Sequence, residues 1–312
     1  MALKQTMEMM ELLDSAHVTG EEVAAFLRDR GAKFLKVETV RTPQQEGTDF
    51  VKVTIPGREG KTAGGQRPTL GVIGRLGGIG ARPWKIGMVS DGDGAVAAFS
   101  TALKLLDMLR HGDILSGDVM IASHVCPNAP MIPHEPVDFM GSPVDMKTMN
   151  QQEISKEMDA ILSVDTTKGN RVFNQKGVAI SPTVKEGLIL PFAEDLINIL
   201  QICSGRPAQT FTVTMQDITP YGNGLYHINS ILQPSVATSV PVVGVAITTE
   251  SVVPGSATGA SHEIDIATAV KFCIETAKAY GDEKCRFYDV EEYEKFTQLY
   301  GSMKRLQTLG SV

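Results

Sequence analysis

The sequence has no cluster of basic residues and no long apolar run. Its 29 Lys and Arg residues are outnumbered by 36 Asp and Glu residues, and the formal net charge is -7. Nucleic acids and anionic membranes attract proteins through concentrated Lys and Arg, so we expect neither as a partner. No stretch approaches the roughly 18 apolar residues of a membrane span, and the first residues lack a basic head followed by an apolar core. We therefore expect a cytoplasmic protein.

The sequence has four cysteines, and no two of them have the C-x-x-C spacing of a metal or redox motif. Cys203 and Cys273 lie among apolar residues within helical patterns, which predicts reduced, structural thiols. Cys126 differs because it lies two residues after His124, in a proline-rich stretch that also contains His134. A thiol nucleophile at Cys126 therefore stays open beside the structural interpretation.

The sequence also lacks a phosphate-binding loop, although glycine is concentrated between residues 74 and 80. The spacing does not match G-x-G-x-x-G, and no G-K-[ST] motif is present. Pro83 and Trp84 follow, where a phosphate-binding loop would lead directly into a helix. We expect no nucleotide here and predict that the glycines let the backbone pass close to a site around Asp91.

The apolar residues that are present make up 42% of the 312 residues, which is enough to bury a large core. Strand patterns alternate with helical patterns, which predicts an α/β fold with a doubly wound, mainly parallel sheet and helices on both faces. We expect a single domain over 1–312, with a helical lid over 1–30 and a helical tail over 281–312. Strands are predicted over 34–40, 48–55, 69–73, 118–124, 158–164 and 241–247, and helices over 193–203, over 264–280 and directly after Asp91.

The stretch 88–99 turns through good helix-capping residues and then opens a helix. Apolar residues recur in that helix at helical spacing, at Val96, Phe99 and Leu103. Asp91 is therefore interpreted either as a helix cap or as a metal ligand held in a fixed orientation by backbone N–H groups at the helix start. The sequence does not decide whether Asp91 or Asp93 is the site carboxylate.

Polar residues worth naming fall at or just beyond the predicted strand ends, at Arg75, Asp91, His124, Asp165 and His262. In a parallel sheet, ligands bind beyond the carboxyl ends of the strands, so we expect these side chains to meet. Carboxylates and imidazoles suit a divalent ion such as zinc, and an open coordination position lets it activate water. Asp165 also fits an Asx turn, and His262 also fits a helix cap.

The order of motifs over residues 68–280 resembles the two-metal aminopeptidases, especially the glutamyl and tetrahedral aminopeptidases. The run Asp91-Gly-Asp-Gly-Ala-Val-Ala97 is similar to the family's Asp-x-x-Gly-x-x-Ala turn, which supplies a carboxylate bridging both metals. The run Ala160-Ile-Leu-Ser-Val-Asp165 is similar to a strand end that supplies a further Asp ligand, and His262 is similar to the final His ligand. The resemblance implies a zinc-aminopeptidase-like fold and a homo-oligomer.

Two positions depart from the aminopeptidase pattern. Arg75 stands where the family has its first His ligand, and Ser123-His124-Val125 stands where a Glu-Glu pair supplies the general base and a metal ligand. The family's inserted substrate-gating domain has no room between residues 79 and 90. The whole chain also resembles a bacterial family of unknown function, through the phrases at 163–169, 216–224 and 258–262.

The leading hypothesis is a metal-dependent hydrolase of a small amide or peptide-like substrate. One divalent metal, expected to be zinc, is bound by Asp91, Asp165 and His262. His124 is then either a fourth ligand or the base that takes a proton from water. Arg75 either replaces the charge of a missing second metal or holds a substrate carboxylate.

The irregular loop at 221–224 is expected to line the substrate pocket, with Tyr221 and Asn223 as its binding residues. Because the Glu-Glu pair is missing and a fold does not guarantee chemistry, a non-catalytic small-molecule-binding or sensing protein is the alternative. A metal-free thiol enzyme that uses Cys126 with His124 or His134 is a third hypothesis.

Overall fold

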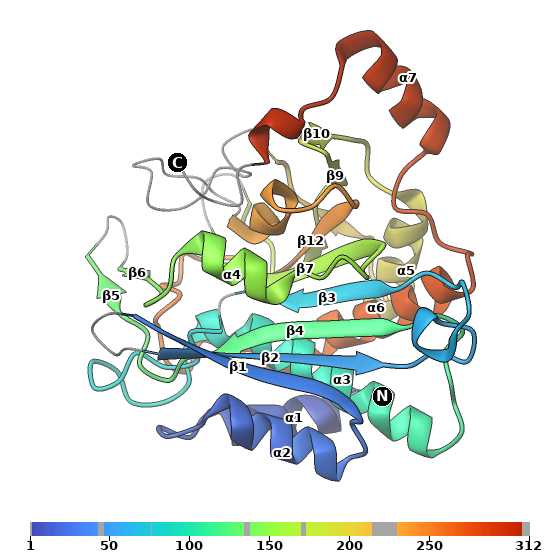
Figure 1. The fold of residues 1–312 in the computed structure, drawn as a ribbon. Coiled ribbons are helices and arrows are strands. Elements are labelled where there is room, and N and C mark those ends of the chain that lie inside the picture. Colours follow the sequence, from blue (N-terminus) through green and yellow to red (C-terminus); the bar gives the residue numbers. More distant parts are fainter. Residues whose placement is uncertain are drawn as a thin grey trace.

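Residues 2–42, 47–75, 77–133, 138–169, 173–213 and 230–307 are described by a computed structural model. The central strands are β1 (Phe34–Arg41), β2 (Gly47–Ile55), β3 (Leu70–Gly74), β4 (Val119–Val125), β7 (Ala160–Thr167), β8 (Gly177–Ile180), β9 (Val184–Lys185), β10 (Leu188–Ile189), β11 (Gln209–Thr210) and β12 (Val242–Thr248). They form one ten-stranded sheet in the order β1-β2-β4-β3-β7-β12-β8-β11, with β9 paired to β12 and β10 paired to β9 (Figure 1). A separate pair is formed by β5 (Met131–Ile132) and β6 (Phe139–Met140).

The centre of the sheet is parallel. β4, β3, β7 and β12 pair parallel to one another in that order, and β11 pairs parallel with β8. Antiparallel pairs flank this centre, between β1 and β2, between β2 and β4, and between β12 and β8. The expected α/β fold with a mainly parallel sheet is confirmed, and its four parallel central strands direct their carboxyl ends to one edge.

Helices cover both faces of the sheet (Figure 1). Their bounds are α1 (Leu3–Leu13), α2 (Gly20–Asp29), α3 (Asp93–Arg110), α4 (Met146–Glu153), α5 (Glu194–Ser204), α6 (Glu263–Gly281) and α7 (Val290–Tyr300), with the short 3-10 helices η1 (Lys61–Ala63), η2 (Ser90–Gly92), η4 (Ser230–Val236) and η5 (Lys304–Leu306). One face carries α3 and α6, against which α1 and α5 pack. The other face carries α4 and η4.

None of the helices in the described ranges is long and apolar enough to cross a membrane.

All four cysteines belong to the described part of the chain, where they are buried and form no disulfide. Burial raises the pKa of Cys203 to about 11 and that of Cys285 to about 12, which keeps both thiols protonated.

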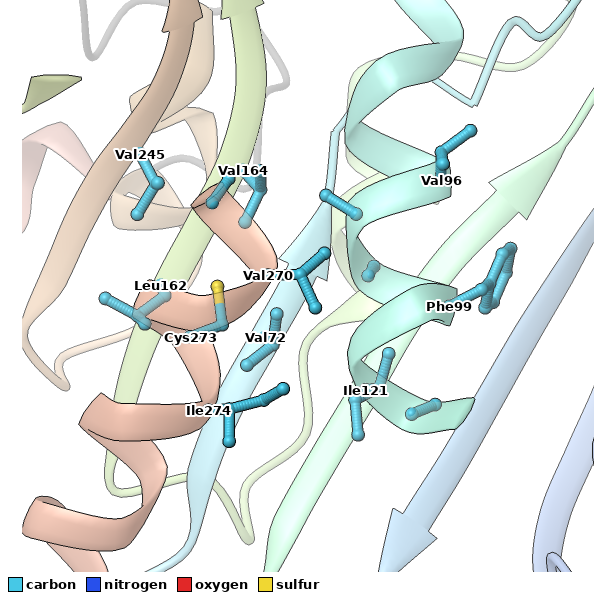
Figure 2. Packing of buried hydrophobic residues seen from close by; sticks show 14 of the residues in the cluster. Val72, Val96, Phe99, Ile121, Leu162, Val164, Val245, Val270, Cys273 and Ile274 are labelled. Atoms are coloured by element: carbon cyan, nitrogen blue, oxygen red, sulfur yellow. The ribbon is translucent and has the colours of Figure 1, made fainter. Parts of the chain in front are cut away.

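A hydrophobic core lies on each face of the sheet, and successive residues of a strand pack alternately into one core and the other, as the period of a β-strand requires. In β7, Leu162 and Val164 belong to the core under α3 and α6, whereas Ile161 belongs to the core on the opposite face. Figure 2 shows Leu162 and Val164 near Val270 of α6, with Val96 on α3 across the same layer. This packing fixes the position of the sheet edge from which the polar residues project.

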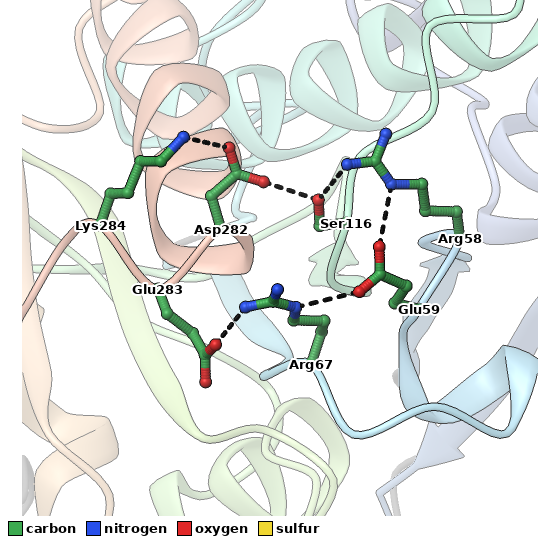
Figure 3. Close-up of polar contacts among 7 residues, drawn as sticks. All are labelled: Arg58, Glu59, Arg67, Ser116, Asp282, Glu283 and Lys284. Atoms are coloured by element: carbon green, nitrogen blue, oxygen red, sulfur yellow. Dashed lines mark hydrogen bonds and ion pairs between the residues drawn. The ribbon is translucent and has the colours of Figure 1, made fainter.

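A polar network joins the segments at the amino edge of the sheet (Figure 3). Ser116 accepts from Arg58 at 3.0 Å and donates to Asp282 at 2.6 Å, and Arg67 is bonded to Glu283 and, at 3.2 Å, to Glu59. These residues lie before β3 and β4 and after α6. The network therefore lies at the edge opposite to the predicted site residues, and it ties down the ends of the elements that position them.

Candidate functional site

Four of the predicted site residues are buried at the carboxyl edge of the sheet. Arg75 follows β3 directly, His124 is the second-last residue of β4, and Asp165 precedes the last two residues of β7. Asp91 lies in η2, the turn that leads into α3. Their exposed fractions are 1% for Arg75, 2% for His124 and Asp165, and 7% for Asp91. The three strands are neighbours in the sheet, so these side chains share one buried region.

Glu153 links Arg75 to His124. Its Oε2 accepts from Arg75 Nη1 at 2.5 Å, and its Oε1 lies 2.6 Å from His124 Nδ1. His124 Nε2 accepts a hydrogen bond from the backbone N–H of Gly77 at 2.9 Å, so the ring proton is on Nδ1 and the imidazole is neutral. Burial alone raises the pKa of Glu153, but the charge of Arg75 and the bond from His124 outweigh it and leave that pKa lowered.

The sequence interpretation missed Glu153 because it missed α4. Asp145 caps this helix by accepting from the Thr148 N–H at 2.7 Å. The side chains that α4 buries are Met149, Asn150 and Glu153. The spacing of these three residues matches one face of a helix, and an Asp precedes them at the cap position. That combination is the signal that predicts a short helix with a glutamate on its inner face.

Asp91 and Asp165 form a pair of buried carboxylates joined by Thr166. The Thr166 hydroxyl donates to Asp91 Oδ1 at 3.2 Å, and the Thr166 backbone N–H donates to Asp165 Oδ1 at 2.6 Å. Burial raises the pKa of Asp91 to about 6, with a further contribution from the charge of Asp93. Burial and the charge of Asp91 raise the pKa of Asp165 well above its ordinary value. Two carboxylates thus lie in a region that disfavours both negative charges.

Asp93, the alternative site carboxylate, already has partners on both oxygens. Ser261 Oγ donates to its Oδ1 at 2.5 Å, and Lys168 Nζ lies 3.3 Å from its Oδ2. Lys168 also donates to the backbone oxygen of Ala260 at 3.2 Å. Burial raises the pKa of Asp93 to about 6 against the opposing charge of Lys168. The structure therefore favours Asp91 over Asp93 as the carboxylate that is available to a ligand.

Two glycines allow the close approach of backbone that the site requires. A Cβ on Gly94 would lie 2.2 Å from the backbone oxygen of Arg75 and 2.6 Å from that of Val164. A Cβ on Gly255 would lie 2.1 Å from Asp91 Oδ1. Gly94 lets the first turn of α3 contact the ends of β3 and β7, and Gly255 lets the loop after β12 cover the Asp91 carboxylate.

His262 lies apart from the other predicted ligands in its contacts. It is the N-cap residue of α6, where its side chain makes no capping hydrogen bond, and it lines a cavity with residues of β8, β11 and α6. Nowhere in the described ranges do three His, Cys, Asp or Glu side chains gather closely enough to hold a metal ion. Ligation by His262 stays a prediction. Tyr221 and Asn223, like His134, lie outside the described residues.

A model of one protein family matches residues 38–310. The chain belongs to the DUF1177 family. That family is described as proteins of unknown function, so the expected resemblance to such a family is confirmed. A search of curated proteins finds no match to this DUF1177 sequence.

Solved structures similar to this DUF1177 chain include peptidases and a cyclase. The cytosol aminopeptidase from Coxiella burnetii is 13% identical at a TM-score of 0.53, over 89% of this chain and 68% of that one. A glutaminyl cyclase from an Acidobacteriales bacterium is 14% identical at a TM-score of 0.49, over 90% of this chain and 94% of that one. A dinuclear metal-binding M20 peptidase from Bacillus subtilis is 12% identical at a TM-score of 0.48, over 90% of this chain and 99% of that one. The first likeness shows the expected aminopeptidase-like fold, and at this identity the fold alone.

The aminopeptidase fold of this DUF1177 chain raises the question of whether its residues suit a metal. Asp91 and Asp165 suit a divalent cation in donor chemistry, because they are buried carboxylates whose negative charges lie near each other. They supply two protein ligands, whereas catalytic zinc sites have three protein ligands and an open position. The donor chemistry of the pair therefore fits one divalent ion, to which Asp91 and Asp165 would contribute two carboxylate ligands.

Proposed function

We propose that the protein is a hydrolase of a small amide or peptide-like substrate and depends on one divalent metal ion, with zinc as the first candidate. The observation that carries this proposal is the Asp91 and Asp165 pair at the carboxyl edge of an aminopeptidase-like sheet. Ligands of open α/β sheets bind at this edge. The pair also lies where the resemblance to two-metal aminopeptidases predicts metal-binding carboxylates.

The charges of the site support one divalent ion rather than two. Arg75 neutralises Glu153, and Lys168 neutralises Asp93. When both are ionised, Asp91 and Asp165 carry two negative charges, and their contacts from Thr166 come from a neutral hydroxyl and a neutral amide. A single divalent ion compensates these two charges, and Arg75 and Lys168 then take the place of any second metal.

Asp91 and Asp165 would hold the divalent ion, which when bound would supply the Lewis acidity that polarises a substrate carbonyl and lowers the pKa of water. Thr166 holds both carboxylates in a fixed orientation through its hydroxyl and its backbone N–H. Glu153 fixes the tautomer of His124, and this leaves Nε2 as the ring nitrogen that can accept a proton. For His124 to act as the base, Nε2 has to exchange its bond from the Gly77 N–H for a bond from water.

The test is elemental analysis of tag-free protein, with Asp91→Asn and Asp165→Asn beside the wild type. The exposed residue Asp113 supplies the matched control, Asp113→Asn. We expect one divalent ion per chain in the wild type and the control after incubation with zinc or manganese, and loss of the ion in both site variants. Hydrolysis of small amides should be abolished by a chelator. An ion retained in both site variants, or turnover that survives the chelator, contradicts the proposal.

A non-catalytic binding protein is the second candidate, and the contacts of His124 favour it. Both ring nitrogens of this residue are engaged within the protein, which is the pattern of a structural histidine. If the protein binds a ligand at the site but hydrolyses no amide in any metal form, the binding function replaces the proposed one. If His124→Gln retains the metal but turns over less substrate than the wild type, the result supports the hydrolase.

A further inference from the structure

A cavity of about 430 Å³ opens beside the start of α6, next to the segments of β8 and β11. β8 begins at Gly177, which pairs with Thr248 at the carboxyl end of β12, so the cavity lies at the same edge of the sheet as the acidic site. Its charged and amide-bearing lining residues are Lys176, Arg206, Gln209, His262, Glu263 and Asp265. A cavity of this size holds a molecule as large as a dipeptide.

Two residues that line this cavity, Asp265 and Gln209, each carry a buried hydrogen-bond acceptor without a donor. Asp265 Oδ2 and Gln209 Oε1 are both shielded from solvent, and the described part of the chain offers neither of them a hydrogen-bond partner. The Gln209 amide is oriented by its Nε2, which donates to the backbone oxygen of Lys176 at 3.3 Å. Buried acceptors are normally satisfied, so this pair points to a ligand that brings N–H donors.

Positive charge lines the same cavity. Lys176 and Arg206 are exposed, and within the described residues no carboxylate forms an ion pair with either of them. The N-cap residue His262 supplies no side-chain capping bond to the first N–H groups of α6, and the acids Glu263 and Asp265 lie in the same first turn. The two basic side chains suit a carboxylate, and the acids of the α6 start suit a cationic group, so the lining matches a ligand that carries both charges.

We propose that this cavity binds a zwitterionic, amino-acid-like molecule such as a free amino acid or a dipeptide. Its ammonium group donates to Asp265 and Gln209, and its carboxylate faces Lys176 and Arg206. A cation without a carboxylate leaves the two basic residues unpaired, and an anion without an ammonium leaves the two acceptors without donors.

The cavity and the acidic site share one segment of backbone. Lys168 donates to the backbone oxygen of Ala260, and Ser261 donates to Asp93. His262, which follows Ser261 directly, lines the cavity. As a substrate site the cavity rests on the proposed hydrolase function, and the substrate class is then a short peptide with both termini free. As a binding site it is independent of hydrolysis.

The experiment is calorimetric titration of the chelator-treated protein, residues 1–312, with three dipeptides. The probes are alanyl-alanine, its N-acetyl derivative without the ammonium group, and its C-terminal amide without the carboxylate. We expect alanyl-alanine to bind with a Kd of about 1 mM or tighter and each blocked peptide to bind at least about tenfold more weakly. Equal binding of all three probes, or no binding of any, overturns the proposal. Since no metal is present, failure here is separate from failure of the metal-dependent hydrolase.

Two variants assign the two ends of the ligand. Asp265→Asn should abolish the preference for alanyl-alanine over the N-acetyl peptide, and Arg206→Gln should reduce the preference over the amide. Glu275→Gln is the matched control, because Glu275 lies on the same helix and pairs with Lys278 away from the cavity. Arg206 is exposed, so its substitution does not endanger folding. Unchanged preferences in both variants overturn the proposal.

Discussion

Replacing Asp91 by asparagine should stabilise the metal-free protein at neutral pH. The folded protein raises the pKa of this buried carboxyl from 3.8 to about 6, so its ionised form is disfavoured in the fold. At about 1.4 kcal/mol per pKa unit, the ionised Asp91 lowers the free energy of unfolding by about 3 kcal/mol at pH 7. Asparagine carries no charge and keeps an Oδ1 that accepts from the Thr166 hydroxyl.

The pH dependence of this effect has a definite sign. The folded state holds its proton on Asp91 more tightly than the unfolded state does, so the wild type gains stability as the pH falls from about 6 to 3.8. Urea unfolding of chelator-treated wild type and Asp91→Asn measures both curves. We expect the variant to be more stable by about 2–3 kcal/mol at pH 7.5, and the two curves to converge near pH 4.

Added zinc should reverse the order of the two proteins. An ion that binds only the folded wild type stabilises it by mass action, whereas the variant has lost a ligand. Asp113→Asn, at an exposed position, controls for the loss of one negative charge and should stay close to the wild type under all conditions. If Asp91→Asn is less stable than the wild type at pH 7.5 without metal, the argument that Asp91 is an uncompensated buried charge is refuted.

Two further predictions test the packing around the site. In urea unfolding, Glu153→Gln and Arg75→Met should each lower the free energy of unfolding by about 3–5 kcal/mol, because each single change leaves a buried charge without its partner. The double variant should lose less than the sum of the two single losses. Additive losses would contradict a coupled pair that also orients His124. Gly94→Ala should lower the free energy of unfolding by about 1–3 kcal/mol, because the added Cβ meets backbone at the ends of β3 and β7. The control Gly47→Ala should be tolerated, because a Cβ there has no neighbour nearer than 3.5 Å. Equal melting temperatures of the two variants would refute this prediction.

The fold was accessible from the sequence because its main elements carry strong periodic patterns. The predicted strand 241–247 is observed as Val242–Thr248, and the predicted helix 264–280 as Glu263–Gly281. Both bury long apolar sets whose spacing differs clearly between helix and strand. The helix α4 was missed because its residues are mostly polar and its buried face is short, so its pattern is weak beside the flanking loops.

The site was accessible only in part. The strand ends placed Arg75, His124 and Asp165 at one edge because parallel strands share their direction, which is a property of the topology. The partners of these residues depend on long-range geometry instead. Lys168 meets Asp93 across 75 positions of the chain, and no local spacing encodes that contact. His262 is the N-cap residue of the expected helix, yet it lines the cavity beside β8 and β11.

The distribution of charge links the two candidate functions to one physical question. Arg75 and Lys168 each neutralise one acid, so the positive charges of the site are already used, and Asp91 and Asp165 have to share either protons or a metal ion. Protons on the two carboxyls are sufficient for a binding function, because a protonated carboxyl can donate a hydrogen bond to a ligand. Hydrolysis requires an electrophile, which protonated carboxyls at neutral pH supply poorly and a divalent ion supplies well. The occupant of this pair at neutral pH therefore determines whether the aminopeptidase-like edge acts as a catalyst or as a receptor.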